Sequence, residues 1–289
     1  MAKLSNNLQE KILHRLGFRE QPSADIANLQ RLYASWCAHV PFDNLRKMIA
    51  LKSGDNQPLP GMDASEFFGN WLKDGSGATC WPMANAFYVL LSSLGFQASR
   101  VAGSMRDMGI ISHGSVKVAF DGLEYLADAP LLLNVILPLD QRTFINDDLV
   151  FPVESEPDGK SHLVWMLIPP GNDYYYCRMN HNPVGFSLFE ERYEATRERS
   201  IFNQRLYARH NYPGELILLW GNVRFSKTAK GLERIELSRD EVCKALRTDI
   251  GISESLVNDW VASGSLEASF DPPSGSPPPS TILKPPSQR

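Results

Sequence analysis

The chain has 289 residues and a formal net charge of −4, and 43% of its residues are hydrophobic. These values are typical of a globular protein with two or three modest domains. A slightly acidic chain without a run of Lys or Arg argues against a nucleic-acid surface, so no nucleic-acid partner is expected. No window reaches the ~18 consecutive apolar residues of a membrane span, so no membrane partner is expected either.

The four cysteines are far apart and form no CxxC pair: Cys37, Cys80, Cys177 and Cys243. This spacing argues against a zinc site made of cysteines, and we expect no metal. The N-terminal segment is amphipathic and lacks the apolar core of a signal peptide. We therefore expect a cytoplasmic protein, in which a free thiol persists.

The first ninety residues are predicted to be mainly helical. Apolar residues recur at helical spacing over residues 8–16 and 23–39, and a shorter helix is predicted over 64–72. Proline breaks the second helix, so residues 40–45 are expected to form an extended turn. Residues 51–62 are rich in Gly and Pro and are predicted to be a loop.

Residues 74–96 carry the first functional signal. Gly75-Ser76-Gly77 predicts a flexible turn, and Cys80 precedes an apolar run that predicts a buried helix ended by Gly95. Cys80 is thus predicted at the N-terminus of a core helix, where free backbone N–H groups and the helix dipole favour a thiolate. The simpler alternative is that Cys80 is a small buried hydrophobic residue.

The middle of the chain is predicted to be antiparallel β-structure. Strands are expected over 98–105, 115–120, 123–127, 163–169, 174–179, 215–220 and 224–225. Asp121-Gly122 is a strong signal for a two-residue hairpin turn. Residues 185–205 are expected to be a loop followed by a helix. Ser238 and Glu241 form a capping box that begins a helix ended by Gly251, and a last helix is predicted over 253–260.

A cysteine nucleophile needs a base, and the base needs a group that orients it. His113 opens the first strand of the predicted hairpin, and Asp128 follows the second strand in an apolar setting. The two strand ends are therefore expected to lie side by side. An acid in that setting needs a partner, which an imidazole supplies. The alternative is a structural hydrogen-bonded pair without chemistry.

A cysteine at a helix start, then histidine on one strand and aspartate after the next, resembles the arylamine N-acetyltransferase family. The segment HVPFDNL (39–45) is similar to its (V/I)PFENL segment, and the cysteine helix shares the closing Leu-Gly-Phe (94–96). Residues 113–129 resemble its histidine–aspartate hairpin, and residues 237–253 resemble its closing helix.

The resemblance implies an α+β, cysteine-proteinase-like fold. It implies an N-terminal helical bundle with the cysteine (1–96), a central antiparallel β-barrel with His and Asp (97–200) and a C-terminal α/β lid (201–270). The remaining Pro- and Ser-rich tail, 271–289, is predicted to be disordered because it cannot bury apolar surface.

The resemblance also implies an activity. Cys80 would be the acyl-accepting nucleophile, His113 its base and Asp128 the orienting residue of a ping-pong acyltransferase. The acyl group would come from acyl-CoA or an acyl carrier protein and pass to a small-molecule amine or hydroxyl. Because the thioester is a co-substrate, no permanently bound cofactor is expected. Further residues are predicted to contact substrate: Phe42, Trp81, Pro130 and Leu131.

Two loops depart from the family pattern. Gly75–Thr79 stands where the family has Arg-Gly-Gly before its cysteine, so the arginine is missing. Ala129–Leu132 stands where the family has x-Gly-Phe-Gly. We therefore expect a poor arylamine acetylator that uses another acceptor or a bulkier donor. Two other functions remain open: a transglutaminase-like amide-forming or hydrolytic enzyme with the same triad, and a non-catalytic binding protein.

Overall fold

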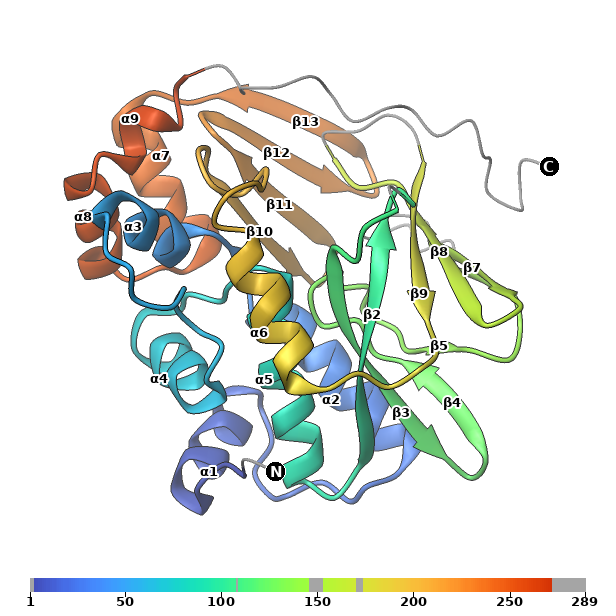
Figure 1. Cartoon of the computed structure of the whole chain (residues 1–289). Helices are drawn as coiled ribbons and strands as arrows, with labels where there is room; N and C mark the ends of the chain where they lie inside the picture. The colour runs from blue at the N-terminus through green and yellow to red at the C-terminus, as the bar shows by residue number, and fades with distance from the viewer. Residues whose placement is uncertain (1–2, 108, 146–152, 170–173, 272–289) are drawn as a thin grey trace.

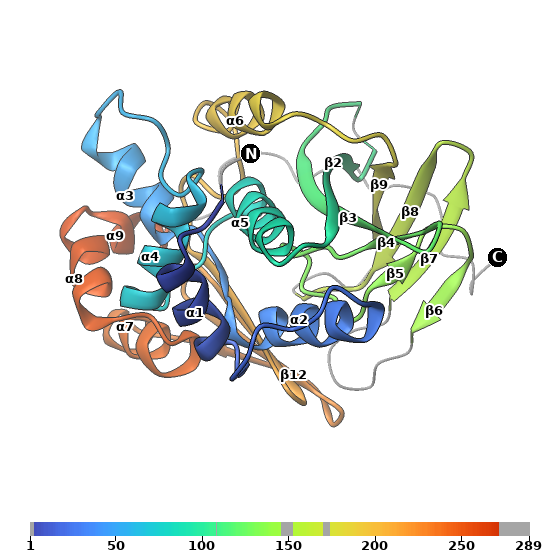
Figure 2. The same cartoon turned by 90° about the horizontal axis from the view of Figure 1, so that it is seen from below.

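The computed structural model describes residues 3–107, 109–145, 153–169 and 174–271. The N-terminal helices lie between a β-barrel and a C-terminal group of helices that flanks a second sheet (Figure 1). The view from below shows the same three parts, with the cysteine helix α5 near the centre (Figure 2). In the described part of the chain, no helix combines the length and apolar character needed to cross a membrane.

Five helices form the N-terminal part: α1 (Asn6–Arg15), α2 (Ile26–His39), α3 (Leu45–Ser53), α4 (Ala64–Asp74) and α5 (Cys80–Ser93). Short polar side chains cap the starts of α1, α2 and α4, as at Asp25, which accepts a hydrogen bond from the Asn28 amide at 2.8 Å. Helix α3 differs from the prediction. Leu45 and Met48 are fully buried against the C-terminal helices, and this distant contact stabilises a helix where a turn and loop were expected.

Helix α5 is buried on nearly all sides, as its apolar sequence predicts. It contacts α4, α6 and the barrel strands β2 and β3. Pro82 occupies its first turn, where no intrahelical N–H donor is needed. Cys80 is the first residue of the helix, as predicted.

Eight strands form one antiparallel sheet that curls into a near-closed barrel (Figure 1). In sheet order they are β5 (Leu137–Pro138), β4 (Leu123–Leu126), β3 (His113–Phe120), β2 (Gln97–Met105), β9 (Tyr175–Asn180), β8 (Ser161–Met166), β7 (Val153–Asp158) and β6 (Thr143–Ile145). Phe120 pairs with Leu123, and both turn residues have positive φ, 49° at Asp121 and 79° at Gly122. This is the predicted two-residue hairpin.

A second antiparallel sheet has the order β1 (Phe42–Asp43), β10 (Tyr207–Tyr212), β11 (Glu215–Trp220), β12 (Val223–Thr228) and β13 (Gly231–Glu236). The remaining helical elements are α6 (Phe186–Ala195), α7 (Arg239–Ala245), the π-helical turn η1 (Leu246–Ile250), α8 (Glu254–Ala262) and α9 (Ser265–Ala268). Because β1 pairs with β10, the segment just before α3 is joined to the C-terminal sheet. The predicted α+β fold class is confirmed. The predicted disordered tail lies outside the described residues, apart from Asp271.

Candidate active site

Cys80 lies where the helical bundle meets the barrel. It is 9% exposed, and its Sγ is 3.8 Å from the Ser112 carbonyl oxygen on the segment that leads into β3. Its position at the start of α5 places it beside the free N–H groups of the first helical turn. Two of the other cysteines, Cys37 and Cys177, are buried, and burial raises the pKa of both thiols.

His113 and Asp128 form the pair predicted from the hairpin. The His113 Nε2 atom lies 3.1 and 3.0 Å from the two carboxylate oxygens, and both side chains are buried. The Leu131 amide donates to Asp128 Oδ1 at 2.9 Å, which holds the carboxylate in place. With Nε2 bonded to Asp128, the opposite ring nitrogen is the one that can bond the Cys80 thiol.

The surroundings of His113 favour its charged form. Burial lowers the pKa of His113, but the charge and hydrogen bonds of Asp128, together with the hydrogen bond and charge of Cys80, raise it to about 10. The imidazole is therefore a cation near neutral pH, and a cation next to a thiol favours the thiolate. The site thus places an imidazolium beside the thiol, with a buried carboxylate behind the ring.

Helix α2 fixes the backbone around Asp128. The Tyr33 hydroxyl donates to the Asp128 carbonyl oxygen at 2.7 Å and accepts from the Leu133 amide at 3.0 Å. The Trp36 indole donates to the Ala129 carbonyl oxygen at 3.2 Å. These neutral groups of α2 hold the backbone on either side of Asp128 in sequence, so Asp128 has little freedom to move away from the imidazole.

Strand β10 holds the rest of that loop. Arg209 Nη2 donates to the carbonyl oxygens of Pro130 and Leu131 at 2.9 and 2.7 Å, and Asn211 donates to that of Leu132 at 2.7 Å. Pro130 and Leu131 are themselves buried. They lie directly after the orienting carboxylate, and their contact with substrate stays a prediction.

The loop before Cys80 is organised by Asp43. Its buried carboxylate accepts hydrogen bonds from the Gly77 amide at 2.7 Å, the Leu45 amide at 3.1 Å and the Ser76 hydroxyl at 3.2 Å. Burial raises the pKa of Asp43 to about 6, although these hydrogen bonds act in the opposite direction. Only glycine fits at position 77, because a Cβ atom there would lie 1.8 Å from the Pro41 carbonyl oxygen. The turn expected to be flexible is thus tightly bonded.

The two aromatic residues predicted to contact substrate have different surroundings. Phe42 is paired with Ala78, two residues before Cys80, and its ring is 5.1 Å from that of Phe202 and 5.3 Å from that of Tyr207. Trp81 is 1% exposed and packs edge-on against Phe189 of α6, with ring centroids 5.0 Å apart. Trp81 therefore contributes to packing between α5 and α6, and its contact with substrate stays a prediction.

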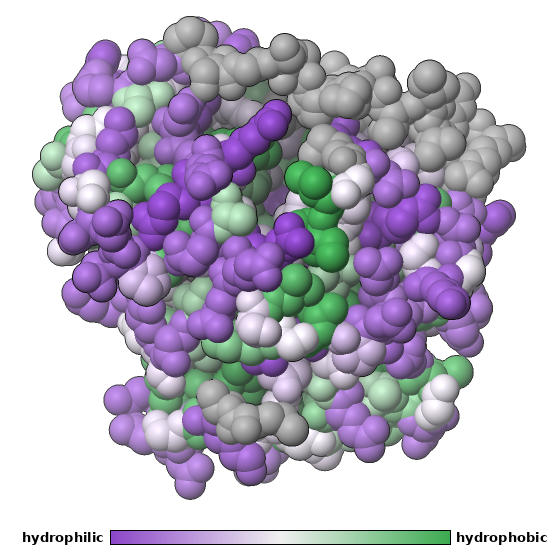
Figure 3. Space-filling model, viewed as in Figure 1, coloured by the Kyte–Doolittle hydropathy of each residue, from purple (hydrophilic) through white to green (hydrophobic). Residues whose placement is uncertain are grey.

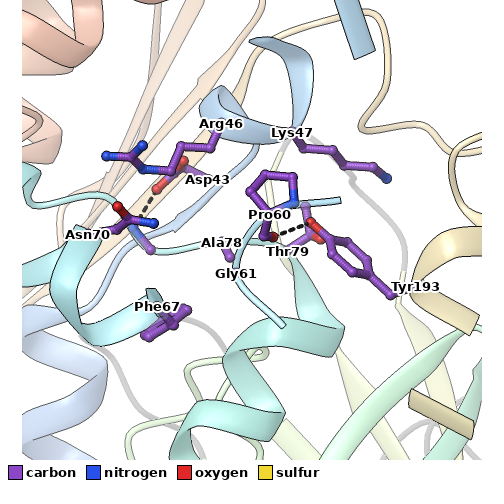
Figure 4. Close-up of a pocket in the computed structure, with 11 residues that line it drawn as sticks. Asp43, Arg46, Lys47, Pro60, Gly61, Phe67, Asn70, Ala78, Thr79 and Tyr193 are labelled. Atoms are coloured by element: carbon purple, nitrogen blue, oxygen red, sulfur yellow. Dashed lines mark hydrogen bonds between the residues drawn. The ribbon is translucent and has the colours of Figure 1, made fainter. Parts of the chain in front are cut away.

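Sequence reasoning missed a second group of side chains, which lie beside the segment just before Cys80. Figure 4 shows a pocket in which Lys47 from α3 and Tyr193 from α6 border the segment that ends at Thr79. The Tyr193 hydroxyl donates to the Pro60 carbonyl oxygen at 2.9 Å. No local signal marks these residues, because α3 itself was not predicted and α6 is more than a hundred residues away.

Comparisons with known proteins agree with this architecture. A family model described as N-acetyltransferase matches residues 25–142. The arylamine N-acetyltransferase of Mycobacterium smegmatis superposes with a TM-score of 0.76 at 18% identity, over 90% of this chain and 96% of that one. The resemblance to the arylamine N-acetyltransferase family is confirmed.

Two further arylamine N-acetyltransferases have a similar fold. The Mycobacterium marinum enzyme, solved in complex with CoA, gives a TM-score of 0.77 at 18% identity, over 91% of this chain and 98% of that one. The Salmonella typhimurium enzyme gives 0.74 at 15% identity, over 91% of this chain and 100% of that one.

One curated relative matches part of the chain. Proansamycin X synthase of Amycolatopsis mediterranei (strain S699) is 26% identical over 124 residues, which are 41% of this chain and 46% of that protein. The match therefore spans about half the length of the curated relative.

Proposed function

We propose that this protein is an acyltransferase that uses Cys80 as nucleophile, His113 as acid and base, and Asp128 to orient the imidazole. The observation that carries the proposal is the His113–Asp128 pair, bonded at 3.0 Å beside a thiol at a helix N-terminus. The match of residues 25–142 to an N-acetyltransferase family supports the reaction class.

In the first half-reaction the Cys80 thiolate attacks the acyl carbon of a thioester. The carbonyl oxygen gains negative charge, which backbone N–H groups near the helix N-terminus can stabilise. The bond from the acyl carbon to the leaving sulfur then breaks, and the leaving thiolate takes the proton of the His113 imidazolium. The products are an acyl-enzyme, a free thiol and a neutral His113.

In the second half-reaction an amine or hydroxyl attacks the Cys80 thioester. Neutral His113 takes the proton that the acceptor loses, and Cys80 leaves as a thiolate. The thiolate–imidazolium pair is then restored. Asp128 keeps its charge throughout, because its part is to hold the ring and stabilise its cationic form.

We propose acyl-CoA as the donor, since the Mycobacterium marinum relative was solved with CoA. No observation here supports an acyl carrier protein as partner, and the cytoplasmic location stays a prediction. Figure 3 shows a hollow between the second sheet and the barrel, beside a band of apolar surface.

The test is intact mass spectrometry after incubation with acetyl-CoA and longer acyl-CoAs. We expect wild-type protein to gain the mass of one acyl group, and Cys80→Ser to gain none. Cys243→Ser is the matched control and should behave as wild type, because Cys243 is a half-buried cysteine outside the site. An acyl group that persists in Cys80→Ser, or no gain with any donor, would contradict the proposal.

The replaced loops lead to a prediction about acceptors. Acetyl transfer to aniline should be slower than acetyl transfer to the fastest acceptor in a panel of aliphatic amines and alcohols. Alternatively, longer acyl thioesters should be used faster than acetyl-CoA. The reason is that Ala129–Leu132 lacks the aromatic residue that the family pattern has in this loop. Aniline acetylation as the fastest reaction by a wide margin would show that other residues, such as Phe42 and its neighbours, restore the pocket.

A further inference from the structure

Lys47 is a buried cation near the candidate site. Its side chain lies on α3 and the residue is 3% exposed. The Nζ atom donates to the Thr196 hydroxyl at 2.7 Å and lies 5.8 Å from the centre of the Tyr193 ring. Within the described residues no carboxylate is at ion-pair distance from it. Because a buried ammonium is costly without an opposite charge, this arrangement calls for an anion nearby.

The other charged groups around Lys47 are already engaged. On α6, Glu194 accepts from Arg197 at 3.0 Å and from the Leu59 amide at 2.5 Å. On α3 itself, Arg46 pairs with Asp74. Asp43, which lines the same pocket, accepts from the Gly77 amide at 2.7 Å and from the Leu45 amide at 3.1 Å. The remaining acidic group that acts on Lys47 is the Cys80 thiol.

The pocket places Lys47 beside the segment that leads to Cys80. Lys47, Thr79 and Tyr193 all line it, and Thr79 is the residue directly before Cys80 (Figure 4). Charges separated by protein rather than water attract each other over several ångströms, since the effective dielectric constant is roughly 20 instead of ~80. Lys47 thus lies on the α3 side of the segment that carries Cys80, and His113 lies on the barrel side.

We propose that Lys47 is a positioning residue whose ammonium supplies a second counter-charge for the Cys80 thiolate. This inference rests on the acyltransferase function proposed above. It explains why a buried lysine is stable here, and it gives this site a fixed cation although the loop before Cys80 lacks the family's arginine.

The ionisation of Lys47 makes the idea testable by pH. Burial lowers the pKa of Lys47 to about 8, while Cys80 acts to raise it, Arg197 to lower it and Glu194 to raise it. The ammonium is therefore charged near pH 6 and neutral well above pH 8. Its effect on the thiolate should be present at the lower pH and absent at the higher one.

The experiment is peptide-resolved labelling with iodoacetamide as a function of pH, with Lys47→Gln as the variant. The change removes the charge and retains a polar donor, on a side chain that is one bond shorter. We expect Cys80 of the variant to label about tenfold more slowly than wild type near pH 6, a factor that corresponds to one pH unit. Above about pH 9 the two rates should converge, because Lys47 is then neutral in wild type as well.

Two further variants make the result decisive. Lys52→Gln removes a charge from the exposed side of the same helix and should keep the wild-type profile. Thr196→Val keeps the ammonium but removes its anchor, and should slow labelling near pH 6 by a smaller factor, about threefold. A wild-type pH profile in both Lys47→Gln and Thr196→Val would overturn the proposal, and if Lys47→Gln fails to fold, the Thr196→Val profile decides alone.

The readout also separates this inference from the proposed function. If wild-type Cys80 labels no faster than Cys243 near pH 6, Cys80 is not a reactive thiolate and the proposed function fails. If wild-type Cys80 labels fast and the Lys47 and Thr196 variants match it, only the role of Lys47 is wrong.

Discussion

The two loops that meet at the candidate site are held in different ways. The loop before Cys80 is bonded to one buried carboxylate, Asp43, whose pKa is raised to about 6. The loop after Asp128 is bonded to the neutral donors Tyr33 and Trp36 and to the permanent cation Arg209. The hydrogen bonds that hold the Cys80 loop therefore depend on a group that titrates near pH 6. The hydrogen bonds that hold the Asp128 loop come from groups that do not change charge near that pH.

The largest expected effect is on the rate of acyl-enzyme formation when Asp128, the partner of His113, is changed. Asp128→Asn keeps the size of the side chain but removes the charge that holds His113 as a cation. We expect acyl-enzyme formation to slow by roughly 10³–10⁴-fold, as for loss of the acid in comparable triads. The rate is measured by quenched-flow mass spectrometry with an acyl-CoA. Asp140→Asn, at an exposed position, is the control. A loss of less than about tenfold in Asp128→Asn would argue that Asp128 is only structural.

The next effect tests the pH sensitivity of the cysteine loop. The folded-state pKa of Asp43 is about 6, against 3.8 for an ordinary aspartate, so the unfolded chain releases this proton first. Ionisation of Asp43 therefore lowers the free energy of unfolding as pH rises from about 4 to 6, by on the order of 2–3 kcal/mol in full. Asp43→Asn should lose this contribution in denaturant titrations. The same pH slope in variant and wild type would contradict the assignment.

A histidine in the barrel titrates in the same window with the opposite sign. Burial, with a smaller effect from His181, lowers the pKa of His162 from 6.5 to about 4. Its contribution to the free energy of unfolding is present above about pH 6.5 and is lost as pH falls towards 4, by at most about 3 kcal/mol. In His162→Leu, the free energy of unfolding should therefore fall less between pH 6.5 and 4. Asp43→Asn is best compared with its parent in a protein that carries His162→Leu, because the two opposite effects no longer overlap. An unchanged acid limb would mean that His162 is charged in the fold.

The smallest effect is expected where the support is neutral. Tyr33→Phe removes the hydroxyl that bonds both the Asp128 carbonyl and the Leu133 amide. The free energy of unfolding should fall by about 1–3 kcal/mol, by the same amount from pH 5 to 8, because no ionisation is involved. A loss that depends strongly on pH would remove the contrast between the two loops. Tyr125→Phe, on a half-buried tyrosine of β4, is the matched control.

Local chemistry explains which parts could be predicted. The β3–β4 hairpin could be predicted because Asp121-Gly122 specifies a two-residue turn, and that turn sets the register that brings His113 towards Asp128. The cysteine helix was found because its apolar run and its closing glycine are continuous in sequence.

The missed parts depend on contacts between distant segments. Helix α3 is stabilised by burial against α8 and α9, some two hundred residues later, and nothing in its own sequence shows that. Strand β13 has only exposed residues, so it lacks the alternation of a half-buried strand. Lysine is usually a surface residue, so the sequence gives no sign that Lys47 is buried. Its burial depends on the packing of α6 and of Thr196, which follows that helix.

The central claim is that the resting site holds a thiolate–imidazolium pair, and the ionisation of His113 tests it most directly. NMR of protein with isotope-labelled histidine would follow the His113 ring from pH 5 to 10, with Cys80→Ala as the partner sample. The account predicts that wild-type His113 keeps both ring protons through neutral pH and loses one only towards pH 10, and that it titrates lower when the thiol is removed. A wild-type ring that is already neutral at pH 7, or a titration unaffected by Cys80→Ala, would contradict it.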